Sequence, residues 1–385
     1  MKTPSIPSSQ RRRLLLGGLS LPWLSACGGG SSAMASPAPT PAPAPTAAEV
    51  PALKTHFAGK FRIGMAADPS GYQDPIAQPL ILKHANSITA ENAFKPASLA
   101  TAPGVYNWAT ADALVAFATA NNLVVRGHTL VWHQQTPDWF FNGTAADIRA
   151  RLEAYITDVV THFKGKLTCW DVVNECTSDD GSAVYRNSRW YQTLGPQYIE
   201  IALRAARAAD PNVKLFINDY STEDPAKFAR LMTLVSELQA RGVPLDGIGH
   251  QLHVSTGTPT PANVDNALRG VAAKGLINHV TELDVSLYDD PGSCFASKAG
   301  CLADLTGDPV ALAAALKKQA LQYRALFNVF LQHPSLQSVT TWGIADNHTW
   351  LTGFPINRGN RPLLFDAAGA AKPAARAITD DAYVP

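Results

Sequence analysis

Two glutamates stand at the ends of short apolar segments, where a carboxyl group can do acid chemistry. Glu175 ends the segment 169–175, and Glu282 stands near the end of the segment 277–284. Both segments are rich in β-branched residues, which is typical of buried parallel strands. Two carboxyls that face each other across a cleft can act as proton donor and nucleophile on a glycosidic bond. We therefore predict that Glu175 and Glu282 are the acid/base and the nucleophile of a glycoside hydrolase.

Polar or aromatic residues also stand at the ends of nearly all the remaining segments that we predict to be strands. In a parallel barrel the carboxyl ends of the strands meet at one face, and catalysis takes place there. The residues that we expect at this face are Glu91, Asn92, Lys95, His128, Trp132, Asn174, Tyr220, Gln251, His253, Trp342 and Trp350. So many strand ends of this kind predict a deep polar cleft.

Eight strand-like segments alternate with amphipathic segments between about residue 50 and residue 380. The predicted strands are 61–67, 85–91, 124–131, 168–174, 214–219, 246–253, 278–284 and 338–343. This alternation predicts an α/β fold of the (β/α)8 TIM-barrel type. An open, doubly wound sheet is the competing fold, and we disfavour it because no glycine-rich phosphate loop follows the first strand.

Four helix starts carry capping signals. The segment Thr144 to Asp147 has the form of a capping box at the start of a predicted helix 144–163. In three other helices an aspartate would cap the free N–H groups and a proline would occupy the first turn. These three begin at Asp74-Pro75, Asp224-Pro225 and Asp308-Pro309.

The N-terminus reads as an export signal. Residues 1–26 contain three consecutive arginines, a short apolar run and small residues before Cys27. The run ending at Cys27 resembles a bacterial lipobox, so we expect Cys27 to be lipidated and the protein to be an exported envelope lipoprotein. Plain secretion is the alternative, and the paired arginines leave the Sec and twin-arginine routes open. Residues 27–49, rich in Gly, Ser, Pro and Ala, would form a linker, followed by a catalytic domain at 50–385.

The net charge and the cysteine positions indicate which ligands and which disulfide to expect. The leader carries four basic residues and no acidic ones, so its removal changes the formal charge from +1 to −3. A chain without a basic surplus is a poor nucleic-acid ligand, so we expect none. Cys294 and Cys301 are close enough in a loop for a disulfide, whereas Cys169 and Cys176 lie at opposite ends of one predicted strand. We expect no metal and no cofactor, because no His/Cys spacing suggests one.

Six motifs together resemble the family-10 glycoside hydrolases, which are mostly endo-β-1,4-xylanases with a (β/α)8 barrel and a retaining mechanism. The resemblance covers roughly residues 55–380. The motifs are Ser87-Ile88-Thr89-Ala90-Glu91-Asn92, Gly127-His128-Thr129-Leu130-Val131-Trp132-His133, Trp170-Asp171-Val172-Val173-Asn174-Glu175, Asn218-Asp219-Tyr220, Gly249-His250-Gln251-Leu252-His253 and Thr281-Glu282-Leu283-Asp284.

The resemblance implies a role for each site residue. Asn174 would donate to the sugar 2-hydroxyl, and Asp284 would orient His253, which would hold Glu282 ionised. Ionised Glu282 would in turn raise the pKa of Glu175. The groups that bind the glycone hydroxyls would be Glu91, Asn92, Lys95 and His128, and Gln251 would make a contact near the nucleophile. The stacking walls of the −1 and −2 subsites would be Trp132, Trp342 and Trp350, with Tyr220 on the aglycone side.

We expect the protein to be a monomeric xylanase that acts on xylan. Three other functions are alternatives to this one. A β-1,4-glucanase or mixed glycanase would use the same mechanism. A non-catalytic glycan-binding barrel would lack one of the two carboxyls, and both are present. A metallohydrolase barrel would need a His-x-His pair after the first strand, which is missing.

Overall fold

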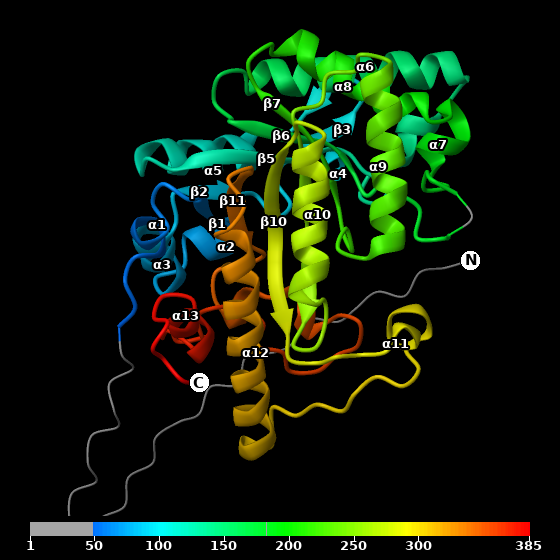
Figure 1. The fold of residues 1–385 in the computed structure, drawn as a ribbon. Coiled ribbons are helices and arrows are strands. Elements are labelled where there is room, and N and C mark those ends of the chain that lie inside the picture. The colour runs from blue at the N-terminus through cyan, green and yellow to red at the C-terminus, as the bar shows by residue number, and fades with distance from the viewer. Residues whose placement is uncertain (1–48, 182) are drawn as a thin grey trace, which may run out of the picture. The chain divides into compact units, whose positions relative to one another are not determined.

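The computed structural model describes residues 49–181 and 183–385 (Figure 1). The predicted leader at 1–26, the predicted lipidation site Cys27 and all but the last residue of the predicted linker lie outside the described residues. Within the described part of the chain, no helix is both long enough and apolar enough to cross a membrane.

Eight parallel strands form a closed barrel. They are β1 (Arg62–Ala66), β2 (Ser87–Thr89), β5 (Val124–Val131), β6 (Cys169–Asn174), β7 (Lys214–Asp219), β8 (Gly247–His250), β10 (Ile277–Ser286) and β11 (Leu336–Thr341). Their order is β11-β1-β2-β5-β6-β7-β8-β10, and the pairing of β10 with β11 closes the sheet. The predicted (β/α)8 barrel is therefore confirmed. A short pair, β3 (Ala100–Ala102) and β4 (Val105–Tyr106), lies outside the barrel sheet.

Helices separate successive barrel strands, and Figure 1 shows α10 alongside β10. The longer helices are α3 (Ala77–His84), α5 (Ala109–Ala120), α6 (Ala145–His162), α8 (Gln197–Ala209), α9 (Pro225–Ala240), α10 (Pro261–Ala273) and α12 (Pro309–Phe330). The short ones are α1 (Leu53–His56), α2 (Pro69–Tyr72), α4 (Pro96–Leu99), α7 (Arg189–Leu194), α11 (Gly292–Ser297) and α13 (Pro373–Ala377).

Close packing inside the barrel explains the apolar character of the strands. All six residues of β6 are buried, as expected for a strand with side chains on one face in the barrel interior and on the other under the helices. Gly127 of β5 leaves room for the Trp170 ring, since a Cβ atom at residue 127 would lie 2.2 Å from it. Phe94 and Phe163 pack edge-on against neighbouring rings, and Phe94 meets Trp170 at 5.4 Å.

The predicted strand 246–253 is wrong in one respect, because it is interrupted. β8 ends at His250, Leu252 has a left-handed backbone with φ of 55°, and β9 (His253–Ser255) resumes beside β10. The break places His253 opposite Asp284 in the register of β9 and β10. Hydrogen bonds replace the lost ladder, because the Gln251 N–H donates to Asp219 O and the Glu282 N–H donates to Gln251 O, both at 3.0 Å.

The predicted helix caps are confirmed at three of four positions. Thr144 and Asp147 form a capping box, and Asp224 and Asp308 cap α9 and α12 with proline in the first turn. Asp74 differs, because its carboxylate accepts the N–H groups of Ile76 and Ala77 while the helix itself begins at Ala77. Proline 75 therefore lies before α3 rather than in its first turn.

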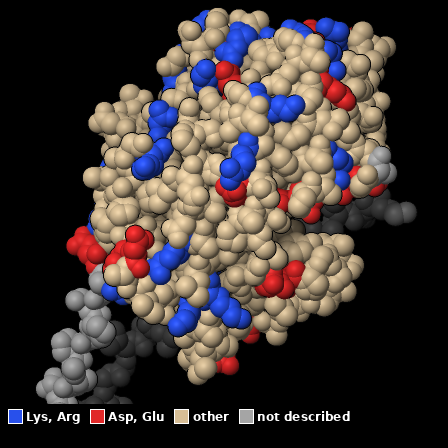
Figure 2. All heavy atoms as spheres, viewed as in Figure 1, with Lys and Arg blue, Asp and Glu red and all other residues tan. Residues whose placement is uncertain are grey.

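The cysteines pair as predicted. Cys294 and Cys301 form a disulfide with Cα atoms 4.8 Å apart, and Cys169 and Cys176 are buried free thiols. The disulfide lies in the segment between β10 and α12. A buried ion pair between Asp290 of this segment and Arg358 also connects the segment to the rest of the barrel. Charges of both signs are interspersed over the face drawn in Figure 2.

Candidate active site

Glu175 directly follows β6, and its backbone is held in an uncommon conformation. Its φ of 57° lies in the left-handed region that side-chain-bearing residues seldom adopt. The Glu175 N–H donates to the carbonyl of Asn218 at 2.7 Å, and the Glu175 carbonyl accepts from Arg186 Nε at 2.6 Å. These two bonds turn the chain at the end of β6, so that the carboxyl leaves the strand at the catalytic face of the barrel.

Glu282 stands within β10 and is almost completely buried, with 4% of its surface exposed. Its Oε1 accepts from Asn218 Nδ2 at 2.7 Å, and its Oε2 meets His253 Nε2 at 3.1 Å. The other ring nitrogen of His253 meets Asp284 Oδ2 at 2.9 Å. The structure therefore places Asp284, His253 and Glu282 in the predicted order.

These contacts keep Glu282 ionised. Burial acts to raise the pKa of Glu282, but the hydrogen bond from His253 and the charges of His128 and His253 outweigh it and lower that pKa to about 2. Burial likewise acts to lower the pKa of His253, whereas Asp284 and Glu282 raise it to about 10. At neutral pH the pair is therefore an imidazolium beside a carboxylate.

A row of side-chain amides joins the two glutamates. Gln251 Nε2 donates to Glu175 Oε1 at 3.1 Å and lies 3.2 Å from the Asn174 amide. The Asn174 amide lies 2.8 Å from Asn218 Nδ2, which donates to Glu282. Glu175 and Glu282 thus share one continuous hydrogen-bond network, and the structure brings the two predicted acids together.

The surroundings of Glu175 favour its protonated form. Burial raises the pKa of Glu175 most, and the charge of Asp219 raises it further. The bonds from Gln251 and from Trp132 Nε1, at 2.8 Å from Glu175 Oε2, oppose this rise. The charge of Glu282 also raises the pKa of Glu175, as predicted, but it contributes less than burial and Asp219 do.

Glu91, Asn92 and Lys95 gather beside Trp132. Lys95 Nζ donates to Asn92 Oδ1 at 3.0 Å and lies 5.2 Å from the centre of the Trp132 ring. Asp68, which the sequence analysis missed, accepts from the side chain and from the backbone of Asn92 at 2.7 and 3.0 Å. Burial raises the pKa of Glu91 and lowers that of Lys95. These groups form a compact polar surface next to the acid/base.

His128 and the two other tryptophans lie around Glu282. His128 Nδ1 is 3.1 Å from Asp171 Oδ2 and 4.0 Å from Glu282 Oε1, and Trp342 packs edge-on against the His128 ring at 5.3 Å. Trp350 Nε1 donates to Asp284 Oδ2 at 2.9 Å. The tryptophans at positions 132 and 350 therefore use their indole N–H groups on the carboxylates, besides any stacking role.

Tyr220 lies apart from the amide row. Its hydroxyl donates to Asp179 and accepts from Arg186 Nη2 at 2.7 Å, and Lys227 Nζ lies 3.4 Å from the centre of its ring. The predicted contact of Tyr220 with the aglycone stays a prediction.

Several residues of this site were not predicted from the sequence. Asn218 and Asp219 belong to a motif that we noted without assigning their roles. Asp171 also stands in a noted motif, and it pairs with the buried Arg126 on β5. Their signal was a polar residue inside an apolar strand, where an unpaired charge would be costly.

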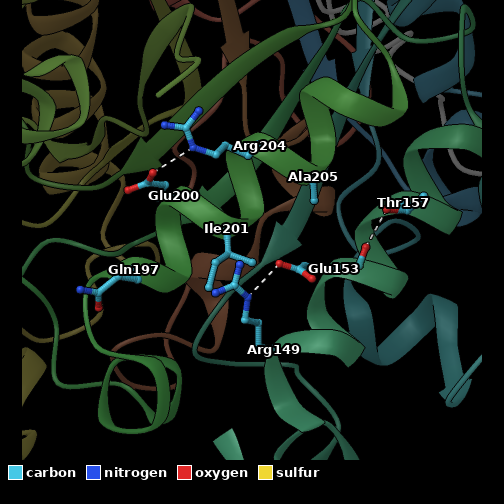
Figure 3. Close-up of a pocket in the computed structure, with 8 residues that line it drawn as sticks. All are labelled: Arg149, Glu153, Thr157, Gln197, Glu200, Ile201, Arg204 and Ala205. Carbon is cyan, nitrogen blue, oxygen red and sulfur yellow. Dashed lines mark hydrogen bonds and ion pairs between the residues drawn. The ribbon is translucent and has the colours of Figure 1, made fainter. Parts of the chain in front are cut away.

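A surface hollow lies away from these residues. It has a volume of about 410 Å³ between α6 and α8, and Figure 3 shows two ion pairs within it, Arg149 with Glu153 and Arg204 with Glu200. None of the predicted site residues lines it. Among the described residues no group of three His, Cys, Asp or Glu side chains could hold a metal ion.

A closed parallel barrel whose catalytic face carries two glutamates, one with a raised and one with a lowered pKa, has the arrangement expected of a glycoside hydrolase. The chain belongs to glycosyl hydrolase family 10, because the model of that family matches residues 52–381. The resemblance noted in the motifs is thus confirmed over almost the whole described chain.

Proteins similar to this chain include several named for xylan hydrolysis. It is 39% identical to the thermostable celloxylanase of Thermoclostridium stercorarium, over 87% of this chain and 88% of that protein. It is 39% identical to the endo-1,4-beta-xylanase of Geobacillus stearothermophilus, over 84% of this chain and 97% of that protein. The crystal structure of xylanase B from Clostridium stercorarium F9 superposes with a TM-score of 0.79 at 40% identity and covers 86% of this chain and 100% of that one.

The His253 and Glu282 pair makes the stability of the fold depend on pH. The pKa of His253 is raised from 6.5 to about 10, so its contribution is full below pH 6.5 and is lost as pH rises toward 10. The pKa of Glu282 is lowered from 4.5 to about 2, so its contribution to stability is full above pH 4.5 and is lost as pH falls toward 2.

We expect the loss of unfolding free energy in His253→Gln to be largest between pH 4.5 and 6.5. Urea unfolding across pH measures it, and a pH-independent difference would contradict this account.

Proposed function

We propose that this family-10 glycosyl hydrolase is an endo-1,4-β-xylanase that cleaves internal bonds of xylan with retention. The single observation that supports this most is the amide row joining two glutamates whose pKa values are shifted in opposite directions. Opposite shifts in one buried pair give one carboxyl the proton that the other lacks, as a double-displacement reaction requires. The names of the similar proteins supply the substrate.

In the first step Glu282 acts as the nucleophile. Its ionised carboxylate attacks the anomeric carbon, while protonated Glu175 gives its proton to the leaving glycosidic oxygen. The hydrogen bond from His253 and the charges of His128 and His253 favour a nucleophile that is ionised before substrate arrives. Asn174, which meets the Asn218 amide, would bond the sugar 2-hydroxyl more tightly in the transition state than in the ground state.

In the second step the same groups exchange roles. The ester on Glu282 carries no charge, so that part of the repulsion on Glu175 disappears. Ionised Glu175 then takes a proton from water, which attacks the anomeric carbon and releases the sugar with its original configuration. Glu91, Asn92, Lys95 and His128 would hold the glycone hydroxyls through both steps, and Trp132 and Trp342 would wall the sugar faces.

Replacing the two glutamates tests these roles. We expect Glu282→Gln to abolish turnover of linear xylan while xylan binding survives, because the nucleophile is lost and the pocket is kept. We expect Glu175→Gln to slow hydrolysis of substrates with poor leaving groups by about 10²–10⁴-fold, since general acid catalysis contributes that much.

Product analysis by proton NMR should show the β-anomer first. Unchanged turnover in Glu282→Gln, or an α-anomer as the first product, would contradict the mechanism.

Substrate preference separates a xylanase from a glucanase with the same mechanism. Xylose lacks the 6-hydroxymethyl group of glucose, so a pocket fitted to xylose leaves no room for that group. We expect aryl xylobioside to be cleaved with a much higher kcat/KM than aryl cellobioside. A preference for the cellobioside would assign the enzyme to β-1,4-glucans.

Export and anchoring form a separate proposal that rests on residues 1–49 alone. We propose that residues 1–26 are removed, that Cys27 is acylated and that residues 27–49 tether the catalytic domain to the cell envelope. Mass spectrometry of the mature N-terminus tests this. A diacylglyceryl mass on Cys27 supports it, and an unmodified N-terminus would favour plain secretion.

A further inference from the structure

Lys227 is a buried cation next to the candidate acid/base. It belongs to α9, has 3% of its surface exposed, and forms ion pairs with Asp219 at 3.0 Å and with Asp179 at 2.8 Å. Its ammonium group also lies 3.4 Å from the centre of the Tyr220 ring. A buried ammonium is tolerated only when it is paired, so these partners define one position for it.

The first path from Lys227 to Glu175 is electrostatic and passes through Asp219. Asp219 is completely buried at the end of β7 and accepts the N–H groups of Thr177 at 2.9 Å and Tyr220 at 3.0 Å. Its charge is the strongest of those that raise the pKa of Glu175. Lys227 carries the opposite charge on the same carboxylate, so it reduces the field that Glu175 experiences.

The second path is mechanical and passes through Asp179 and Arg186. Asp179 Oδ2 pairs with Arg186 Nη1 at 2.9 Å, and Arg186 Nε donates to the Glu175 carbonyl at 2.6 Å. That carbonyl belongs to the residue whose φ is 57°, so the bond helps to hold an uncommon backbone conformation. Lys227 positions the other oxygen of Asp179 and thereby orients the whole pair.

The remaining groups that contact the Glu175 carboxyl are not hydrogen-bond or ion-pair partners of Lys227, although its charge is a minor cause of the lowered pKa of His133. Trp132 and Gln251 donate to its carboxyl, and Glu282 lies across the amide row. His133 Nδ1 lies 3.8 Å from Glu175 Oε2, but burial lowers the pKa of His133 to about 4, so it is neutral at working pH. A change at Lys227 therefore alters the field on Glu175 without removing a hydrogen bond from its carboxyl.

We propose that Lys227 is a positioning residue for the acid/base Glu175, acting on its field through Asp219 and on its backbone through Asp179 and Arg186. The inference rests on the proposed function, since it concerns the proton that Glu175 gives to the leaving group. Lys227 acts on the reaction only through these neighbours, and it is not a catalytic residue.

The pH profile of kcat/KM on phenyl xylobioside tests the inference, because its basic limb follows the protonated fraction of Glu175. Asp219→Asn removes a negative charge, so the basic limb should move to lower pH by about one unit. Lys227→Met leaves Asp219 uncompensated, so the basic limb should move to higher pH by about one unit. Lys227→Arg keeps the charge and should restore the wild-type limb.

A better leaving group supplies a second readout. Dinitrophenyl xylobioside has a leaving group, dinitrophenolate, that departs without needing a proton. The rate of the glycosylation step in Lys227→Met should therefore fall less on this substrate than on phenyl xylobioside. Lys214→Met is the matched control, because Lys214 forms an ion pair with Asp246 at 3.0 Å at the opposite end of β7. Its basic limb should stay in place.

The outcomes are distinguishable. Limbs that stay in place in both Lys227→Met and Asp219→Asn, or that move in the same direction, would overturn the inference while leaving the proposed function intact. If Lys227→Met does not fold, Lys227→Gln, which also removes the charge but keeps a polar side chain, takes its place, and its basic limb must move to higher pH. A wild type that does not cleave the xylobiosides, or a Glu175→Gln variant as active as wild type on the phenyl substrate, would overturn the proposed function and this inference with it.

Discussion

The site depends on keeping two nearby carboxyl groups in different protonation states. Like charges in a buried network would share protons unless the protein favours one arrangement. Here a histidinium between Asp284 and Glu282 holds one carboxyl ionised, and burial together with Asp219 raises the pKa of Glu175. Other features of the catalytic face place these charges accurately, which matters because the energy between two charges depends on their distance.

The barrel provides that accuracy through its strand ends. Glu175 directly follows β6, and Asn218 lies in the neighbouring strand β7. A backbone hydrogen bond of 2.7 Å between the two residues fixes their relative position. The break between β8 and β9 turns Gln251 toward Glu175 and sets His253 opposite Asp284.

The sequence predicted the architecture and the charged centre, because both have local signals. The alternation of apolar segments predicts the barrel, and capping residues such as Asp224 and Asp308 mark helix starts. The missing partners had no local signal. Lys227 lies in the first turn of a helix, where a lysine is normally solvated, and only the fold brings it to Asp219. The contribution of Asp219 to the raised pKa of Glu175 was not predicted for the same reason, since the influence of a charge depends on its position in space.

The order of the causes acting on Glu175 also bears on the second half of the reaction. When Glu282 becomes an ester its charge disappears, but burial and Asp219 remain, and these contribute more to the raised pKa of Glu175. Burial and Asp219 therefore still act to raise the pKa of Glu175 in the covalent intermediate. A base with a raised pKa accepts a proton from water more readily, provided that it is ionised at working pH. The opposing charge of Lys227 limits how far Asp219 raises that pKa, so one lysine behind the site helps the same carboxyl to serve as acid in one step and as base in the next.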